Sequence, residues 1–312
     1  MARQLRALNS QVVAITGGAR GIGRASAAAL LARGARVAIG DLDAELTRRV
    51  AQELGAGAIG LGLDVTSRES FSGFLDRVER ELGPLDVLVN NAGIAPLGEF
   101  AREPDAIAER VLEVNVAGTM RGCKLALERM LPRGAGHIVN VSSGLGRTPS
   151  PGIVTYAASK HAIVGLTESL RIELDGSGVE LHLILPNLTG TDMSDGVRAL
   201  RAARIVTPEA VAAAIVAVLQ SGRREAYVPR QLGWLVRLET ILPRAVVQPL
   251  RGLLGANRMF TNVDALERAA YEARIAPPAA AQADRAANVA SAAASVADAL
   301  RAEHGPGDHP GR

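Results

Sequence analysis

The fold of this chain is set by the stretch Val12-Val-Ala-Ile-Thr-Gly-Gly-Ala-Arg-Gly-Ile-Gly23. Its first five residues are typical of a buried strand, and they run directly into a turn with glycine at positions 17, 21 and 23. Glycine lets the backbone come close to a bound anion, and the amides at the start of the following helix point toward that anion. A strand, such a turn and a helix in this order predict a pyrophosphate site.

The first two-thirds of the chain alternate short β-type runs with amphipathic helical stretches. The predicted strands are Val12–Thr16, Arg36–Gly40, Ala58–Leu63, Leu85–Asn90, His137–Ser142, Glu180–Leu185 and a shorter Ala226–Val228. The predicted helices lie near 22–33, 43–54, 67–82, 104–130, 154–175 and 207–220. Strands without polar alternation that alternate with helices predict the α/β class: a doubly wound parallel sheet, Rossmann-like, of about seven strands. Ligands of such sheets bind beyond the carboxyl ends of the strands.

Composition and charge exclude several classes of protein. A chain of 312 residues that is 48% hydrophobic can bury the core of one large domain. Its single cysteine, Cys123, excludes an intramolecular disulfide and favours a reducing compartment. No metal-ligand spacing surrounds that cysteine, so the sequence predicts no metal site. The net charge of +3, without a dense basic run interleaved with aromatic residues, predicts no nucleic-acid partner.

The hydropathy pattern predicts a cytoplasmic protein. The sequence has no uncharged apolar run of about 18 residues, the length that a membrane-spanning helix needs. The N-terminus carries Arg3 and Arg6 and lacks the apolar stretch of a signal peptide.

Three segments are expected along the chain. Residues 1–229 form the dinucleotide-binding and catalytic domain, residues 230–276 an apolar, arginine-rich helical extension, and residues 277–312 a disordered tail rich in Ala, Pro and Gly. Within and around the extension, arginine recurs every seventh residue, at 223, 230, 237, 244, 251 and 258, while Pro243 and Pro249 break any continuous helix. Residues 230–260 are interpreted as a lid or subunit contact of a homo-oligomer that covers the region Met193–Arg204. The alternative is peripheral contact with a membrane surface.

Tyr156 and Lys160 form a pair one helical turn apart in the stretch Thr155-Tyr-Ala-Ala-Ser-Lys160. The only other lysine of the chain is Lys124, so 33 of the 35 basic residues are arginine. A lysine ammonium beside a phenol lowers the phenol pKa from about 10 toward working pH. Such a pair suits the exchange of a proton with an alcohol or ketone oxygen. Taken alone, the spacing is more typical of an ordinary amphipathic helix that carries an exposed lysine, and the other motifs of the chain reverse that preference.

Asp41 stands at the end of the second predicted strand, 18 residues after Gly23. A carboxylate at this position accepts hydrogen bonds from both adenosine ribose hydroxyls and repels a 2′-phosphate, which favours NAD over NADP. Two observations leave alternatives open. Asp41 could instead cap the following helix, although Asp43 is available for that role, and Arg20 in the glycine turn could pair with a 2′-phosphate.

With these residues assembled, the chain resembles the short-chain dehydrogenase/reductase family over about residues 10–229. The resemblance rests on six features in the family's order: Thr16–Gly23, Asp64-Val65, Asn90-Asn91-Ala92-Gly93, Asn115, Ser142-Ser143, and Tyr156 with Lys160. The family's catalytic serine precedes the tyrosine by 13 residues, which selects Ser143 over Ser142.

The resemblance implies a role for each matching residue. Tyr156 is the general acid or base, Ser143 donates to the substrate oxygen, Lys160 lowers the tyrosine pKa and binds the nicotinamide ribose, and Asn115 holds a water beside Lys160. The residues expected to bind the cofactor are Gly17, Arg20, Gly21, Ile22, Gly23, Asp41, Asp64, Val65, Asn91, Ala92, Gly93, Tyr156, Lys160, Pro186, Thr189 and Thr191.

One departure from the family's pattern follows the sixth predicted strand. The family has Pro-Gly there, followed by a threonine that binds the nicotinamide carboxamide, whereas this chain reads Pro186-Asn187-Leu-Thr189-Gly-Thr191. Asparagine tolerates positive φ better than most residues, so the turn is expected to form.

The sequence therefore predicts an NAD-dependent oxidoreductase that acts on a hydrophobic, lipid- or steroid-like secondary alcohol or ketone. Two alternatives remain: an NADP-dependent ketone reductase, and a catalytically silent binding or scaffold protein at a membrane surface.

Overall fold

The computed structural model describes residues 6–197, 205–243, 245–247, 249, 259–261 and 263–276. By its internal contacts the chain divides into a unit Met1–Arg274 and a unit Ile275–Arg312, and the described residues belong almost entirely to the first. The predicted tail 277–312 lies outside the described residues, as do Arg244, Arg251 and Arg258 of the arginine series and residues 198–204.

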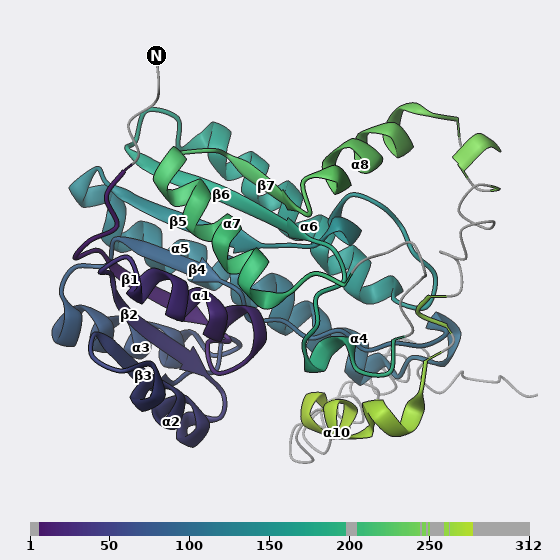
Figure 1. The fold of residues 1–312 in the computed structure, drawn as a ribbon, viewed down its shortest axis with the longest axis horizontal. Coiled ribbons are helices and arrows are strands. Elements are labelled where there is room, and N and C mark those ends of the chain that lie inside the picture. Colours follow the sequence, from purple (N-terminus) through teal and green to yellow (C-terminus); the bar gives the residue numbers. More distant parts are fainter. Residues whose placement is uncertain are drawn as a thin grey trace, which may run out of the picture. The chain divides into compact units, whose positions relative to one another are not determined.

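A single parallel sheet forms the centre of the first unit (Figure 1). Its strand order is β3-β2-β1-β4-β5-β6-β7. The bounds are β1 Val12–Thr16, β2 Arg36–Asp41, β3 Ala58–Gly62, β4 Val87–Asn90, β5 Gly136–Val141, β6 Val179–Pro186 and β7 Glu225–Val228. The order reverses between β1 and β4, so the carboxyl ends of these two strands flank the switch point at which such sheets bind ligands.

Helices cover both faces of the sheet (Figure 1). One face packs against α1 (Gly21–Leu31), α2 (Ala44–Leu54) and α7 (Pro208–Ser221). The other packs against α3 (Arg68–Leu82), α5 (Gly118–Met130) and α6 (Val154–Glu173). The strand interiors are buried Val, Ile, Leu and Ala, which is why they show no polar alternation. The predicted fold class is confirmed.

Local signals in the sequence account for several helix ends. Ser67 caps α3 by accepting a hydrogen bond from the Ser70 amide, and Thr207 caps α7 by accepting one from the Ala210 amide, with Pro208 in the first turn. At the other end of α7, Gly222 takes the left-handed conformation with φ of 63°. Cap residues of this kind explain why the predicted bounds lie within a few residues of those in the structure.

The helix predicted over residues 104–130 has an irregular centre. It consists of α4 (Asp105–Leu112), a π-helical turn at Glu113–Ala117, and α5. The π turn places Asn115 inward, where its side chain bonds to the backbone of Ile94. A tertiary contact therefore sets the irregularity, and the 3.6-residue periodicity of the sequence does not reveal it.

Among the described residues after the sheet, α8 and α10 are helices (Figure 1). The helix α8 (Gln231–Ile241) contacts β7, and Gly233 faces the ring of Tyr227. The helix α10 (Ala265–Ile275) begins after Asp264, whose carboxylate accepts hydrogen bonds from the amides of Leu266 and Glu267. In the part of the chain that is described, no helix has both the length and the apolar character needed to cross a bilayer.

Candidate active site

The glycine turn between β1 and α1 has the shape that a pyrophosphate site needs. Gly17 and Gly21 have φ values of 63° and 45°, and a side chain on Gly23 would lie 2.1 Å from the Gly17 carbonyl oxygen. The helix α1 begins at Gly21 without a side-chain cap, so the amides of its first turn, including that of Ile22, face the loop. These residues fit a dinucleotide phosphate bound at a helix N-terminus.

Hydrogen bonds between Thr16, the last residue of β1, and Asn91, which directly follows the neighbouring strand β4, hold this turn in place. The Asn91 side-chain amide donates to the carbonyls of Thr16 and Gly17, each at 3.0 Å, and the Thr16 hydroxyl accepts from the amides of Asn91 and Ala92, also at 3.0 Å. The position of Ala92 beside Gly17 follows from the same contacts. Asn91 therefore holds the turn in shape, and its predicted contact with the cofactor stays a prediction.

The two aspartates after β2 have different roles. Asp43 caps α2, since its Oδ1 accepts from the Leu46 amide at 2.9 Å. Asp41 ends β2 and accepts a hydrogen bond from the Ala19 amide at 3.3 Å, beside the glycine turn. The helix-cap interpretation of Asp41 is thus excluded. Arg20 pairs instead with Asp192, at 3.7 Å.

Asp64 and Val65 lie after β3 at the same edge of the sheet. The Asp64 carboxylate accepts from the Thr66 amide at 2.9 Å and from the Thr66 hydroxyl at 2.7 Å, which holds the turn before α3. Val65 is buried against Gly118 at the start of α5. Both residues stand where the turn after β3 borders the binding edge.

The segment that follows β6 borders the glycine turn on the side opposite β2. Pro186 ends β6, Thr189 donates to the carbonyl of Asn187 at 2.9 Å, and Thr191 caps a short turn over Asp192–Ser194. The methyl group of Thr191 reaches the glycine turn, because a side chain on Gly21 would lie 2.8 Å from it. Among the described residues Ser10 alone of the non-glycines has positive φ, so Asn187 fits without left-handed strain.

Tyr156, Ser143 and Lys160 come together beyond β5. Tyr156 and Lys160 lie on α6, and Ser143 is the residue that caps the short turn Gly144–Gly146. The Ser142 hydroxyl donates to the Lys160 carbonyl at 2.9 Å and is therefore used within the structure. Ser143, and not Ser142, is the serine whose side chain hydrogen-bonds Tyr156.

The pKa values of this pair differ from the expectation. Burial raises the pKa of Tyr156 to about 12, and the hydrogen bond with Ser143 offsets only part of that rise. Burial also lowers the pKa of Lys160 to about 8. The Lys160 ammonium lies over the tyrosine ring, 5.5 Å from its centroid, and donates to the Val141 carbonyl at 3.0 Å. Desolvation of the phenolate therefore sets the direction of the Tyr156 pKa shift in this structure, and the lowering by Lys160 stays a prediction.

Asn115 and Gly93 complete the surroundings of Lys160. The Asn115 side chain accepts from the Ile94 amide at 2.8 Å and donates to the Ile94 carbonyl at 3.0 Å and to Ser159 Oγ at 2.9 Å. A side chain on Gly93 would meet Asn115 at 3.2 Å and the Lys160 ammonium at 3.5 Å. Gly93 therefore gives Lys160 room beside the strand edge.

The helix α10 contributes to the surroundings of the site in a way that the sequence motifs do not predict. Arg268 is 2% exposed and donates to the carbonyls of Ala95, Met193 and Asp195 and to the carboxylate of Glu272. The Tyr271 hydroxyl accepts from the Ala95 amide at 2.8 Å. The sequence shows one possible partner of Arg268, because Glu272 lies four residues later on the same helix. Its carbonyl partners are 73 to 173 residues away, so no local pattern in the sequence indicates them.

Comparison with known proteins agrees with this geometry. A family model described as short chain dehydrogenase matches residues 11–202, more than half of the chain. The chain belongs to the short-chain dehydrogenase/reductase family. The family match begins just before β1 and runs past Thr191, so it includes every position that was predicted to bind the cofactor or to act in catalysis.

Relatives with assigned activities share much of the chain. It is 40% identical over 230 residues to 2-(S)-hydroxypropyl-CoM dehydrogenase 3 of Xanthobacter autotrophicus, covering 68% of this chain and 90% of that protein. It is 38% identical over 192 residues to 3-alpha-(or 20-beta)-hydroxysteroid dehydrogenase of Mycobacterium tuberculosis, covering 61% and 73%. A solved short chain dehydrogenase/reductase from Burkholderia phymatum in complex with NAD superposes with a TM-score of 0.69 at 26% identity, covering 75% and 94%.

These matches confirm the predicted family and class of enzyme. The short-chain dehydrogenase/reductase described here is an oxidoreductase that acts on CH–OH groups with a nicotinamide cofactor.

Proposed function

We propose that this short-chain dehydrogenase/reductase interconverts a hydrophobic secondary alcohol and its ketone. The observation that carries the proposal is the apolar cluster around Tyr156. Its buried members are Ala95, Ile153, Tyr156 and Phe260, and Leu97, Leu145, Leu188, Met193, Val197 and Met259 pack against them. A substrate whose oxygen meets Tyr156 would place its carbon skeleton among these side chains, where apolar groups bind better than charged ones.

The chain's own residues supply the proton chemistry. Tyr156 exchanges a proton with the substrate oxygen, and Ser143 donates a hydrogen bond to that oxygen as charge develops on it. Lys160 holds a proton at Nζ directly beside the tyrosine ring. The nicotinamide, when bound, supplies or accepts the hydride. The glycine turn 17–23, Asp41, Thr189 and Thr191 would hold that cofactor.

We further propose that NAD(H) is the preferred cofactor. The Asp41 carboxylate stands at the end of β2 beside the glycine turn, where it would accept from ribose hydroxyls and repel a 2′-phosphate. Arg20, which could favour NADP, is directed to Asp192 by their ion pair.

A substrate panel tests the proposed class. Turnover is measured with NAD⁺ on cyclic hydrophobic secondary alcohols, on 2-propanol and on short hydroxy acids. We expect kcat/KM to be at least about tenfold higher for the hydrophobic alcohols, since one methylene group in an apolar site is worth about 10–200-fold. In Phe260→Ala the advantage over 2-propanol should shrink, while activity on 2-propanol itself stays. A preference for the hydroxy acids would refute the proposal.

We also propose a peripheral contact of α8 with an anionic bilayer, the alternative that the arginine series left open. Trp234 and Ile241 are 74% and 80% exposed, and Leu235 and Leu238 are exposed as well. The Arg237 guanidinium lies over the Trp234 ring, 5.7 Å from its centroid. An exposed apolar face with an adjacent cation is typical of interfacial helices.

Flotation with vesicles that contain an anionic lipid tests this contact. The full chain should float at low salt, and Trp234→Ser with Ile241→Ser should abolish flotation. Ile172→Ser, which changes an exposed apolar residue on α6, is the matched control and should float normally. If the chain does not float, and light scattering shows an oligomer that the α8 substitutions dissociate, the subunit-contact interpretation replaces this one.

A further inference from the structure

A second polar cluster lies at the opposite, amino-terminal edge of the sheet. His137 is the second residue of β5, and Glu180 and His182 are the second and fourth residues of β6. His137 is the register partner of Glu180, and His182 lies two residues further along the same strand. Side chains at i and i+2 of a strand share a face with the residue opposite, so all three point to the same side of the sheet.

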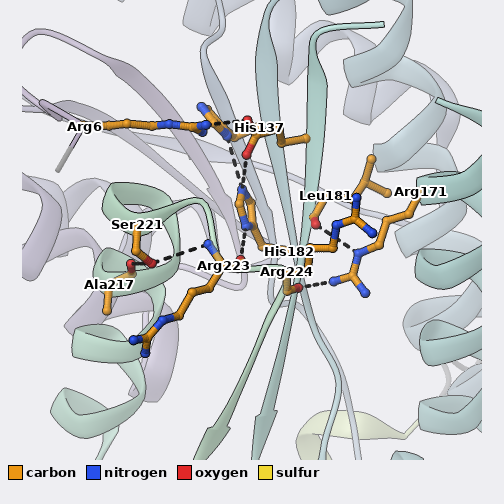
Figure 2. Close-up of polar contacts among 10 residues, drawn as sticks. Arg6, His137, Arg171, Leu181, His182, Ala217, Ser221, Arg223 and Arg224 are labelled. Atoms are coloured by element: carbon orange, nitrogen blue, oxygen red, sulfur yellow. Dashed lines mark hydrogen bonds and ion pairs between the residues drawn. The ribbon is translucent and has the colours of Figure 1, made fainter. Parts of the chain in front are cut away.

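The side-chain atoms converge on one point. His137 Nδ1 lies 3.2 Å from His182 Nε2, and Glu180 Oε2 lies 4.0 Å from the same nitrogen. One ligating atom from each of the three residues falls within 4.8 Å of the others. Figure 2 shows the two imidazoles joined through their facing nitrogens, with Arg6 beside His137 and Arg223 beside His182, next to α7.

The neighbours of the cluster fix its hydrogen-bonding pattern. His182 is fully buried, and its Nδ1 lies 2.7 Å from the carbonyl oxygen of Arg223 (Figure 2). A carbonyl only accepts, so Nδ1 carries the proton and the Nε2 lone pair faces His137 and Glu180. A backbone carbonyl that orients one ring nitrogen in this way is the usual support of a metal-binding histidine.

The two carboxylate oxygens of Glu180 face different partners. Oε1 accepts from Arg6 at 2.6 Å, while Oε2 is the oxygen on the side of His182. Asp86 adds a second negative charge near His137, and Arg171 a second positive charge near His182. The four charges balance, so a divalent cation would meet no net repulsion and its binding would depend on the ligand atoms themselves.

We propose that His137, His182 and Glu180 form a binding site for a divalent first-row transition-metal ion, with Zn²⁺ as the expected occupant. Two imidazole nitrogens at bond lengths of about 2.0–2.1 Å from a tetrahedral ion stand about 3.4 Å apart, close to the 3.2 Å observed. Glu180 Oε2 lies 4.0 Å from His182 Nε2 and would have to move closer to both imidazole nitrogens to complete the same geometry. Two imidazoles and one carboxylate suit zinc and neighbouring metals and disfavour Mg²⁺ and Ca²⁺, which prefer oxygen ligands.

The site would join segments that are distant in sequence. Its ligands come from β5 and β6, its supporting carbonyl from the turn between α7 and β7, and Glu180 connects it to Arg6 of the N-terminal segment. It lies at the opposite ends of β5 and β6 from Ser143 and Pro186. We therefore assign it a stabilising role that leaves the chemical step unchanged.

Calorimetric titration of the full chain, stripped of metal with a chelator, tests the site with ZnCl₂ as the probe. We expect one Zn²⁺ per chain and a rise in Tm of about 2–6 °C when free Zn²⁺ exceeds its Kd a hundredfold. Co²⁺ in place of Zn²⁺ should give visible d–d absorption. His137→Gln and Glu180→Gln, which alter partly exposed ligands, should each weaken Zn²⁺ binding at least about 100-fold, more than the loss of a supporting contact costs.

Two controls separate this site from the other histidines. His161→Gln changes a histidine on α6 outside the cluster and should bind Zn²⁺ like the wild type. The double variant His304→Ala with His309→Ala removes two histidines outside the described residues and should also keep the site. Absence of Zn²⁺ binding by the wild type, binding that survives both ligand substitutions, or binding lost only in the double variant would each overturn the proposal.

Discussion

Two cations are buried around Tyr156, one on α6 and one on α10, and they are held in different ways. Lys160 donates to one carbonyl, that of Val141, and lies over the tyrosine ring. Arg268 donates to three carbonyls and one carboxylate and lies 4.9 Å from the centroid of the Tyr271 ring. The planar guanidinium thus connects three segments, whereas the ammonium is left with one strong protein contact.

This difference separates a chemical role from an architectural one. A guanidinium does not deprotonate in proteins, and its fixed fork suits several simultaneous acceptors. An ammonium shifts its pKa readily when it is buried, as the pKa of Lys160 near 8 illustrates. In a chain with 33 arginines and two lysines, a lysine stands at position 160, where a proton is expected to move, and an arginine at position 268, where segments are joined.

The largest expected effect is a loss of turnover on substitution of Tyr156. Tyr156→Phe removes only the ionisable hydroxyl, so turnover should fall by about 10²–10⁴-fold while cofactor affinity and Tm stay near wild type. Steady-state kinetics and calorimetric titration with NAD(H) measure the two properties. Turnover within a factor of two of wild type would end the assignment of Tyr156 as the acid–base group.

Substitution of Arg268 should reduce the stability of the fold. Arg268→Met leaves three carbonyls without their donor and removes the partner of Glu272, which is partly exposed. Each buried acceptor left unsatisfied costs about 1–3 kcal/mol, so the free energy of unfolding should fall by about 3–5 kcal/mol. Arg268→Lys should recover little, because an ammonium cannot reproduce the fork. Denaturant titration provides the measurement.

Arg274 offers a matched control for Arg268 on the same helix. It pairs with Asp192 at 3.1 Å and also lies over the Tyr271 ring, but it is partly exposed. Arg274→Met should therefore cost less than about 1 kcal/mol. Equal losses for the two arginines would show that burial of Arg268 does not give it a special role.

The titration of Lys160 tests whether its buried ammonium gives up its proton more readily than an exposed one, which is the property that distinguishes it from Arg268. Its pKa of about 8 in the folded chain lies below the value near 10.5 of an unfolded chain. Between these pH values the unfolded chain binds more protons, so stability should rise by about 3 kcal/mol from pH 8 to 10.5 and be lost again as the pH falls through 8. Lys160→Met should lack this part of the pH dependence.

Only two lysines contribute signals, so ¹³C-lysine labelling and NMR can follow Lys160 directly. Lys124→Arg identifies the second resonance. A midpoint for Lys160 above 10 would mean that the buried ammonium is better solvated than its burial indicates.

A smaller effect is expected from the two aspartates after β2. Asp41→Ala should narrow or invert the preference for NAD(H) over NADP(H), since the group that repels a 2′-phosphate disappears, with little change in stability. Asp43→Ala should leave the preference unchanged and cost about 1 kcal/mol of stability as a lost helix cap. Titration with both cofactors distinguishes them. A wild type that binds NADPH more tightly would indicate that Arg20 leaves Asp192 to bind the phosphate.

Local sequence was sufficient for the sheet and the glycine turn, and the resemblance to the family selected Ser143. The sheet and the turn depend on residues within one strand and the turn or helix that follows it, so their spacing is visible along the chain. Seven strands in parallel order then bring their carboxyl ends to one edge, which is why residues from 17 to 191 could be predicted to lie together.

Tertiary structure alone decided the rest. The pKa of Tyr156 depends on how completely the fold removes water from the phenol, and the sequence shows its neighbour Lys160 but not that burial. Arg268 meets Ala95 across 173 residues, and His137 meets Glu180 and His182 only through the register of β5 with β6. Sequence thus determined which residues carry the chemistry and at which edge they meet. The packing of distant segments decided the pKa values of Tyr156 and Lys160, the contacts of Arg268, and the cluster of His137, Glu180 and His182. Desolvation and cross-strand register decide these features, and both are properties of the folded chain.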